Sequence, residues 1–214
     1  MASPPQRQVS YRYEDPLDLI WLECVHQLGW QVKRSHDVFA SWNGAKTLTL
    51  GRASDLDLDD HLGQLILHEL CHALIEGESG EAQVDWGLEN IDSRHLVNEL
   101  ACHRLQAFFA DRINARSFFA VTTDWRPYYD QIPSSHAFHL QTQDQLSVWS
   151  AAFQVTSTEG EALDREAVEL ALQGEERSRH RHWFTIIDQA LERTHQIRSI
   201  IRECSPPHTL WSTF

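Results

Sequence analysis

The chain has 214 residues, of which 42% are hydrophobic, and it includes eight Trp and nine Phe. A chain of this length and composition can bury a hydrophobic core without disulfides, so general disorder is excluded. The formal net charge of −13 argues against nucleic acid as a partner, and we interpret it as a solvated acidic exterior.

Localisation signals are absent from the sequence as given. It begins MASPPQRQVS, which lacks the basic start and apolar run of a signal peptide, and no segment reaches the roughly 18 apolar residues of a membrane span. Four scattered cysteines without a CxxC pair are typical of reduced thiols. We therefore expect a cytoplasmic protein that does not bind a membrane.

The first half of the chain contains signals for a helix, a small sheet and two longer helices. Asp15 is a candidate N-cap before Pro16, and apolar residues at helical spacing continue to Gly29. Residues 30–51 combine β-formers around the hairpin signal Asn43-Gly44, which predicts two or three antiparallel strands.

Helical periodicity then returns in two segments. The first runs from Asp59 to Gly77, and residues 78–90 are predicted to be a loop or short extended piece. The second covers residues 93–115, with Asp92 or Ser93 as its cap.

The C-terminal part is aromatic and turn-rich from residue 118, with helices predicted at 164–174 and 181–204. We expect residues 1–13 to be a disordered tail and 14–117 to form a metal-binding core. Residues 118–214 would then form a mostly helical part packed on that core, within a single domain.

The stretch LILHELCHALIEG places two histidines and a glutamate in an otherwise apolar helix. His68 and His72 are one turn apart and project from one face, so both imidazoles can reach one ion, with Glu69 beside them. Leu and Ile residues cover almost the whole circumference, which indicates a buried helix whose polar groups need partners. The pattern predicts a site for one divalent metal ion.

A third ligand must come from another element, and Glu99 is the best candidate. It shares one face of the next long helix with His95, His103 and Gln106. The alternative is a surface carboxylate that pairs with Arg104 or a neighbouring lysine. His103 is the reserve ligand or an outer partner of the ligands.

Other metal-binding residue types are assigned no role. Cys71 and Cys102 flank these faces, and we interpret them as small buried hydrophobic residues, although thiolates are good soft ligands. Nothing in the spacing selects the histidines of the C-terminal part, which are His136, His139, His180 and His182.

The HExxH helix is followed by Gly77, by Asp85-Trp86-Gly87 and by Glu99, with Leu105-Gln106-Ala107 after it. Over about forty residues this arrangement resembles the elongation factor P hydroxylases. The resemblance implies a zincin-like α+β fold and a metal-dependent hydroxylase that modifies a lysine-derived side chain of elongation factor P. It also implies a triad of His68, His72 and Glu99, a set that suits non-haem Fe(II) as well as Zn.

In this fold, a small antiparallel sheet would pack on the HExxH helix and on a second, Glu-bearing helix. The C-terminal part would be helical. Asp85 and Trp86 are expected to shape the site, and the alternative is a Trp that fills a gap in the core.

Two other functions stay open. The segments HELCHALIEG and ELACHRLQAFFA are similar to the ImmA/IrrE-type metallopeptidases, in which zinc would activate a water and Glu69 would be the general base. The third possibility is a non-catalytic zincin-like binding domain. The intact Glu69 weighs against it, because a structural site needs no buried carboxylate beside its ligands.

Overall fold

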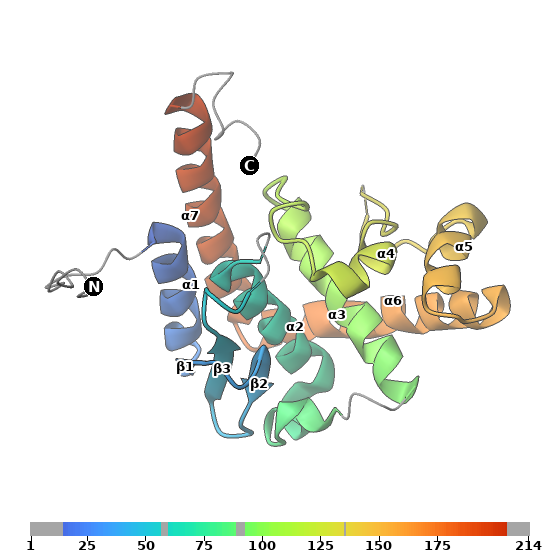
Figure 1. Ribbon diagram of the computed structural model, residues 1–214, viewed down its shortest axis with the longest axis horizontal. Helices are drawn as coiled ribbons and strands as arrows, with labels where there is room; N and C mark the ends of the chain where they lie inside the picture. The colour runs from blue at the N-terminus through green and yellow to red at the C-terminus, as the bar shows by residue number, and fades with distance from the viewer. Residues whose placement is uncertain (1–14, 57–59, 89–92, 135, 205–214) are drawn as a thin grey trace, which may run out of the picture.

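The computed structural model describes residues 15–56, 60–88, 93–134 and 136–204. The elements in chain order are α1 (Pro16–Gln27), β1 (Gln31–Ser35), β2 (Ala40–Trp42), β3 (Thr47–Gly51), α2 (Leu62–Glu81), the short 3-10 helix η1 (Asp85–Gly87), α3 (Ser93–Asp111), η2 (Thr123–Trp125), α4 (Arg126–Tyr129), α5 (Gln143–Ala152), α6 (Ser157–His180) and α7 (Trp183–Cys204) (Figure 1). The expected α+β class is confirmed. The predicted tail, residues 1–13, lies outside the described residues.

The first helix begins where its sequence predicts. The Asp15 side chain accepts a hydrogen bond of 2.8 Å from the backbone N–H of Leu17, and Pro16 occupies the first helical position. Gly29 follows the helix with a φ of 81°, a left-handed conformation that glycine adopts without steric cost. These signals are local, so the sequence alone was sufficient to place α1.

The sheet has three strands in the order β1-β3-β2. The hairpin at Asn43-Gly44 is confirmed: β2 and β3 are antiparallel, and Asn43 Oδ1 accepts from the backbone N–H of Thr47. The prediction of a purely antiparallel sheet is wrong, because β1 pairs in parallel with β3. The turn determines only which strand β2 meets. The partner of β1 depends on packing, since the central strand β3 buries Leu48 and Leu50 in the core.

The HExxH helix differs from its predicted bounds. Asp59 lies outside the described residues, and α2 begins at Leu62 behind a capping box between His61 and Gln64. The helix is interrupted at Gly77 as predicted, where φ is 67°, but a short helical segment after this break extends α2 to Glu81.

The side chain of Arg177 satisfies backbone carbonyls at the break in α2. Its Nη1 atom donates hydrogen bonds of 2.6 and 2.5 Å to the carbonyls of Leu74 and Ile75. These carbonyls face the break, where backbone acceptors would otherwise be unsatisfied. Arg177 belongs to α6, so no local signal in residues 62–81 predicts this contact.

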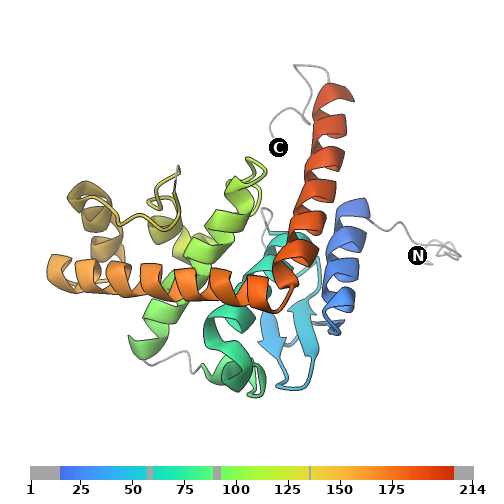
Figure 2. The same ribbon diagram turned by 180° about the vertical axis from the view of Figure 1, so that it is seen from behind.

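The long helices pack side by side around α2. Helix α3 lies against α2, α6 runs across both of them (Figure 2), and α7 packs on α1. The helix predicted at 164–174 is confirmed as part of the longer α6, and the helix predicted at 181–204 is confirmed as α7, which begins two residues later, whereas α5 was not predicted. Helix α3 ends at Asp111, earlier than expected, and its predicted caps lie among residues whose side chains are not described.

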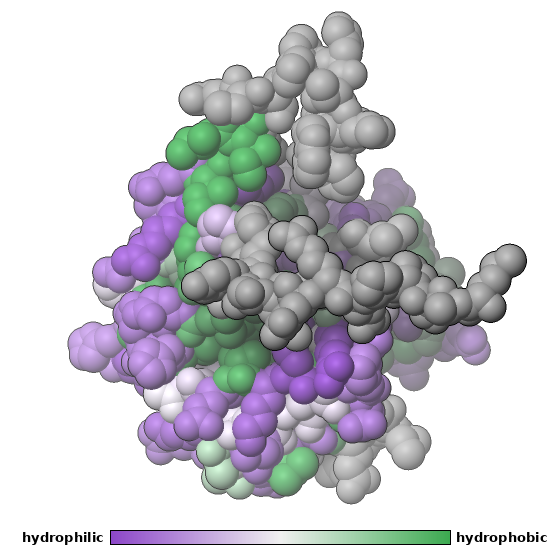
Figure 3. Space-filling view, turned by 60° about the vertical axis from the view of Figure 1, so that its left-hand side comes forward, coloured by the Kyte–Doolittle hydropathy of each residue, from purple (hydrophilic) through white to green (hydrophobic). Residues whose placement is uncertain are grey.

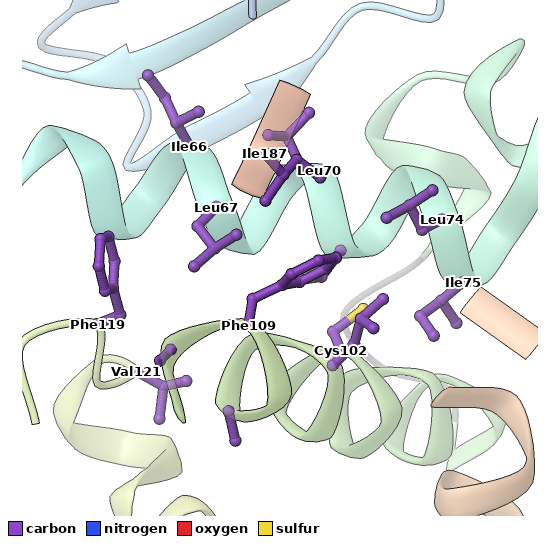
Figure 4. Close-up of a cluster of buried hydrophobic side chains, with 14 of the residues drawn as sticks. Ile66, Leu67, Leu70, Leu74, Ile75, Cys102, Phe109, Phe119, Val121 and Ile187 are labelled. Carbon is purple, nitrogen blue, oxygen red and sulfur yellow. The ribbon is translucent and has the colours of Figure 1, made fainter. Parts of the chain in front are cut away.

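The interface of α2 with α3 forms the centre of the hydrophobic core. Figure 4 shows Leu67 and Leu74 of α2 on the side of Phe109 and Cys102 of α3, whereas Leu70 points to the other side of α2, toward α7. All five residues have 0% exposure, which confirms that α2 is a buried helix. Full burial of a large apolar side chain contributes about 1.5–3 kcal/mol, so this interface fixes the spacing of the two helices.

Apolar surface also remains outside the core. Figure 3 shows hydrophobic side chains on the face where α1 and α7 come forward, and Leu19, Ile200 and Ile201 are the exposed large hydrophobic residues of these helices.

Within residues 15–56, 60–88, 93–134 and 136–204, no helix combines the length and the apolar character needed to cross a bilayer.

Candidate metal centre

His68 and His72 project from the same face of α2, one helical turn apart. Their Nε2 atoms lie 3.0 Å apart, and the two ring planes are nearly perpendicular at 87°. His72 is buried with 4% exposure, and His68 is half-buried. Two imidazole nitrogens that converge on one position are well placed to bind one ion.

Glu99 reaches the same position from α3. Its Oε1 atom lies 3.3 Å from His72 Nε2, and its Oε2 atom lies 3.6 Å from His68 Nε2. Within the described part of the chain, this buried Oε2 atom has no hydrogen-bond partner. Arg104, the alternative partner of Glu99, pairs with Asp164 instead. The structure thus brings the three predicted ligands together.

His103 lies one helical turn beyond Glu99 and faces the same position. Its side chain has 0% exposure, and Nε2 lies 3.7 Å from Glu99 Oε2. Neither ring nitrogen has a hydrogen-bond partner among the described residues, which is costly for a buried polar group. One ligand atom each from His68, Glu99 and His103 lie within 4.8 Å of one another. These three residues form a group that could hold a metal ion.

The charges of the site are unevenly distributed. Burial opposes protonation of His72, but the carboxylate of Glu99 outweighs it and raises the pKa of His72 to about 9. Burial alone would raise the pKa of Glu99, yet the His72 charge holds that pKa well below its usual value. Burial lowers the pKa of His68, and it lowers the pKa of His103 to about 3. His72 and Glu99 therefore form an ion pair between two neutral imidazoles, and a metal would displace the proton of His72.

The outer nitrogens of the α2 histidines also have partners. His72 Nδ1 lies 3.2 Å from the sulfur of Cys102, and His68 Nδ1 lies 3.0 Å from Gln106 Oε1. Burial raises the pKa of the Cys102 thiol well above its usual value, so the group is an uncharged thiol. Cys102 is buried as predicted, but it also contacts a ligand histidine. Such contacts orient metal-binding imidazoles.

Glu69 sits beside the histidines with its carboxylate fixed by Trp86. The indole Nε1 of Trp86 donates a hydrogen bond of 2.9 Å to Glu69 Oε2, and Glu69 is 7% exposed. The Trp86 ring stacks on Trp42 at a centroid distance of 4.6 Å and an interplanar angle of 7°. Trp86 therefore belongs to the core and also contacts a candidate catalytic residue. The two interpretations made from the sequence, a residue that shapes the site and a Trp that fills the core, each describe part of its environment.

Asp85 anchors the turn that carries Trp86. Its Oδ1 atom accepts hydrogen bonds of 2.9 Å from the Ser41 hydroxyl and from the backbone N–H of Trp42. Asp85, Trp86 and Gly87 have φ values of 47°, 61° and 76°. Left-handed conformations cost roughly 1–3 kcal/mol at non-glycine residues, and they persist where surrounding contacts enforce them. The strained turn holds the indole over Glu69.

These residues line a cavity of about 330 Å³. Its polar wall contains His68, His72, His103, Glu69, Glu99 and Asp85. Its other lining residues are largely aromatic and apolar and include Phe39, Trp42, Leu88, Val121 and Trp125. No lysine or arginine is found among the described residues that line it. The cavity can admit a side chain or a small molecule and favours a cationic group.

Several residues considered from the sequence lie elsewhere. Cys71 is buried and does not line the cavity. His136 and His139 stack on each other at 4.3 Å, and His180 pairs with Glu176 on the surface of α6. Trp42 and Trp125 are wall residues that the sequence analysis missed, since no local pattern relates them to the HExxH motif.

Comparisons of the chain with family models, with curated proteins and with solved structures found no match.

Proposed function

We propose that this chain is a metal-dependent, hydroxylase-like oxidoreductase that acts on a protein side chain such as the modified lysine of elongation factor P. Three features support the proposal. They are the donor set around Glu99, the cavity beside it and the sequence resemblance to the elongation factor P hydroxylases. We further propose that its fold is of the zincin-like type.

The observation that carries the proposal is the number of donors around Glu99. Nε2 atoms of His68, His72 and His103 all lie within 3.7 Å of a Glu99 carboxylate oxygen. Catalytic zinc sites use three protein ligands and keep one tetrahedral position open, so four protein ligands would close a tetrahedral ion. Six-coordinate iron would retain two open positions, and a bound iron would supply the oxygen chemistry.

The proposed reaction inserts one atom of O₂ into a C–H bond of the substrate side chain. The second oxygen atom leaves as water, which requires two protons and two electrons from an external two-electron reductant. In this scheme, Glu69 relays a proton at Oε1, because its Oε2 atom is engaged by Trp86. The acidic, lysine-free wall of the cavity would receive an amine-bearing side chain.

The zinc metallopeptidase is the second candidate, and Glu69 is the observation that favours it. This carboxylate lines the cavity beside His68 and is placed for a general base. The edge of the sheet near the cavity argues against a peptidase, because a peptide substrate would bind there as an added strand. Asp85 accepts a hydrogen bond from the backbone N–H of Trp42 in β2, and Asn43, just after β2, forms a bridge with Val84, so these two positions are unavailable to an added substrate strand.

Intact-mass measurement of elongation factor P distinguishes the two activities. The hydroxylase proposal predicts a gain of about 16 Da with iron, reductant and air, none without oxygen, and none with His68→Ala. The peptidase alternative predicts fragments with zinc and without oxygen, abolished by Glu69→Gln. Fragments under anaerobic conditions, with no mass gain in air, would overturn the hydroxylase proposal.

A further inference from the structure

We propose that Gln106 is a positioning residue of the metal centre, which keeps the proton of His68 on Nδ1 and leaves the Nε2 lone pair facing the ion. This inference rests on the metal site of the proposed function, but not on the reaction. Gln106 lies on α3, has 0% exposure and lines the cavity next to the histidines.

The orientation of the Gln106 amide follows from its two partners. Its Nε2 atom lies 2.8 Å from the backbone carbonyl of Phe119, and its Oε1 atom lies 3.0 Å from His68 Nδ1. A carbonyl oxygen can only accept a hydrogen bond, so the NH₂ group must face Phe119. The amide oxygen therefore faces His68, and Nδ1 must carry the proton that it accepts. The remaining nitrogen of His68, Nε2, is the one that lies 3.0 Å from His72 Nε2.

The acceptor that fixes this amide is itself held in place. The Phe119 carbonyl also accepts a hydrogen bond of 3.1 Å from the Tyr129 hydroxyl, and the Phe119 ring is fully buried. The neighbouring Phe118 carbonyl lies 2.8 Å from His61 Nε2 at the start of α2. Contacts from α2, α3 and α4 thus anchor the segment, and rotation of the amide would break both of its hydrogen bonds.

The two ligand histidines of α2 differ in their outer contacts. The amide oxygen of Gln106 is a good acceptor, whereas the sulfur of Cys102 beside His72 is a weak one. A stronger acceptor raises the basicity of the imidazole and fixes its ring orientation more firmly. Since Phe119 lies two residues before Val121 of the cavity wall, Gln106 also connects this wall to a metal ligand.

The test measures metal affinity by chelator competition, with Co(II) as the probe. Gln106→Met keeps the length of the side chain and removes the amide, and we expect it to weaken binding about 10- to 100-fold. Gln106→Glu keeps an oxygen for Nδ1 but loses the donor to the Phe119 carbonyl, so it should restore only part of the affinity. The matched control is Gln141→Met, because Gln141 is also buried but bonds Trp149 away from the cavity. It should lower the melting temperature without changing the affinity.

A second readout separates positioning from folding. Nitrogen-15 spectra of the histidines in the metal-free protein should show the Nδ1-protonated form of His68, and Gln106→Met should shift it toward the other tautomer. Wild-type affinity and an unchanged tautomer in Gln106→Met would overturn this inference but not the proposed function. Equal losses of metal affinity in Gln106→Met and Gln141→Met would overturn it as well. A wild-type protein that binds no metal would overturn the proposed function itself.

Discussion

The Trp86 indole donates a 2.9 Å hydrogen bond to the Glu69 carboxylate inside the apolar surroundings of α2. Burial of an ionised carboxylate without partners is costly, so this contact explains how a glutamate is tolerated at that position. It also leaves one carboxylate oxygen, Oε1, for chemistry in the cavity. The strained turn of Asp85 and Trp86 is therefore a functional element of the proposed site.

Removal of the indole N–H should lower both stability and activity. Trp86→Phe keeps an aromatic ring against Trp42 but leaves Glu69 without its donor, so we expect a loss of about 1–3 kcal/mol in unfolding free energy. Activity should fall about 10- to 100-fold, as for other residues that orient a catalytic group. Trp149→Phe is the control, because its indole bonds Gln141 outside the cavity. Equal activity losses in both variants would contradict a role of Trp86 at Glu69.

Glu99 and His103 should contribute unequally to metal binding. Glu99 lies within 3.7 Å of all three imidazoles, whereas His103 is near only one oxygen of Glu99. Glu99→Gln should therefore lose most of the bound metal, and His103→Gln should lose less. Isothermal titration with Co(II) measures both affinities. The reverse order would make His103 the third ligand.

The metal-free protein should lose stability on both sides of pH 6.5. His103 has a folded pKa of about 3, below its unfolded value of about 6.5, so its contribution is present above pH 6.5 and is lost as the pH falls. His72 has a folded pKa of about 9, so its contribution is lost as the pH rises from 6.5 through 9. Urea unfolding in chelator should show that His103 alone lowers the free energy of unfolding by about 1–2 kcal/mol between pH 6.5 and 5.

The acid limb of this profile has a specific control. His103→Gln should make it shallower, with His68 and Glu99 contributing the remainder, whereas His139→Gln, at an exposed site outside the cavity, should leave it unchanged. An identical acid limb in wild type and His103→Gln would show that His103 is not a buried neutral imidazole.

Asp85→Asn should remove a negative charge from the site while keeping the hydrogen bonds that shape it. The amide oxygen can still accept from Ser41 and from the Trp42 backbone, so stability should remain within about 1 kcal/mol of wild type. Loss of the negative charge at the cavity should raise KM for an amine-bearing substrate. Thermal unfolding and steady-state kinetics measure the two effects. Gross unfolding would assign Asp85 a purely structural role.

Local signals in the sequence predicted the elements that depend on local contacts. Asp15-Pro16 and Asn43-Gly44 act within a few residues, and both occur as predicted. The pairing of β1 with β3 and the continuation of α2 beyond Gly77 depend on distant partners, so periodicity could not predict them. Helix α5 had a usable signal, the capping box of Thr142 and Gln145, that the sequence analysis missed.

The candidate site also combines features that local spacing predicts with features that depend on tertiary packing. The HExxH spacing alone places His68 and His72 on one face, and the helical spacing of Glu99, His103 and Gln106 places them on one face of α3. That these two faces meet is a result of the packing of α2 on α3. The hydrogen bond from Gln106 to Phe119 depends on the chain turning back after α3, which no periodicity shows.

Elemental analysis of protein purified without added metal tests the central claim most directly. The His68, Glu99 and His103 group, together with His72, predicts about one divalent ion per chain in the wild type, with iron the expected element. The His68→Ala, His72→Ala double variant should contain almost none and should melt at a lower temperature than the metal-loaded wild type. Equal metal content in the double variant and the wild type, or no metal in either, would contradict the account.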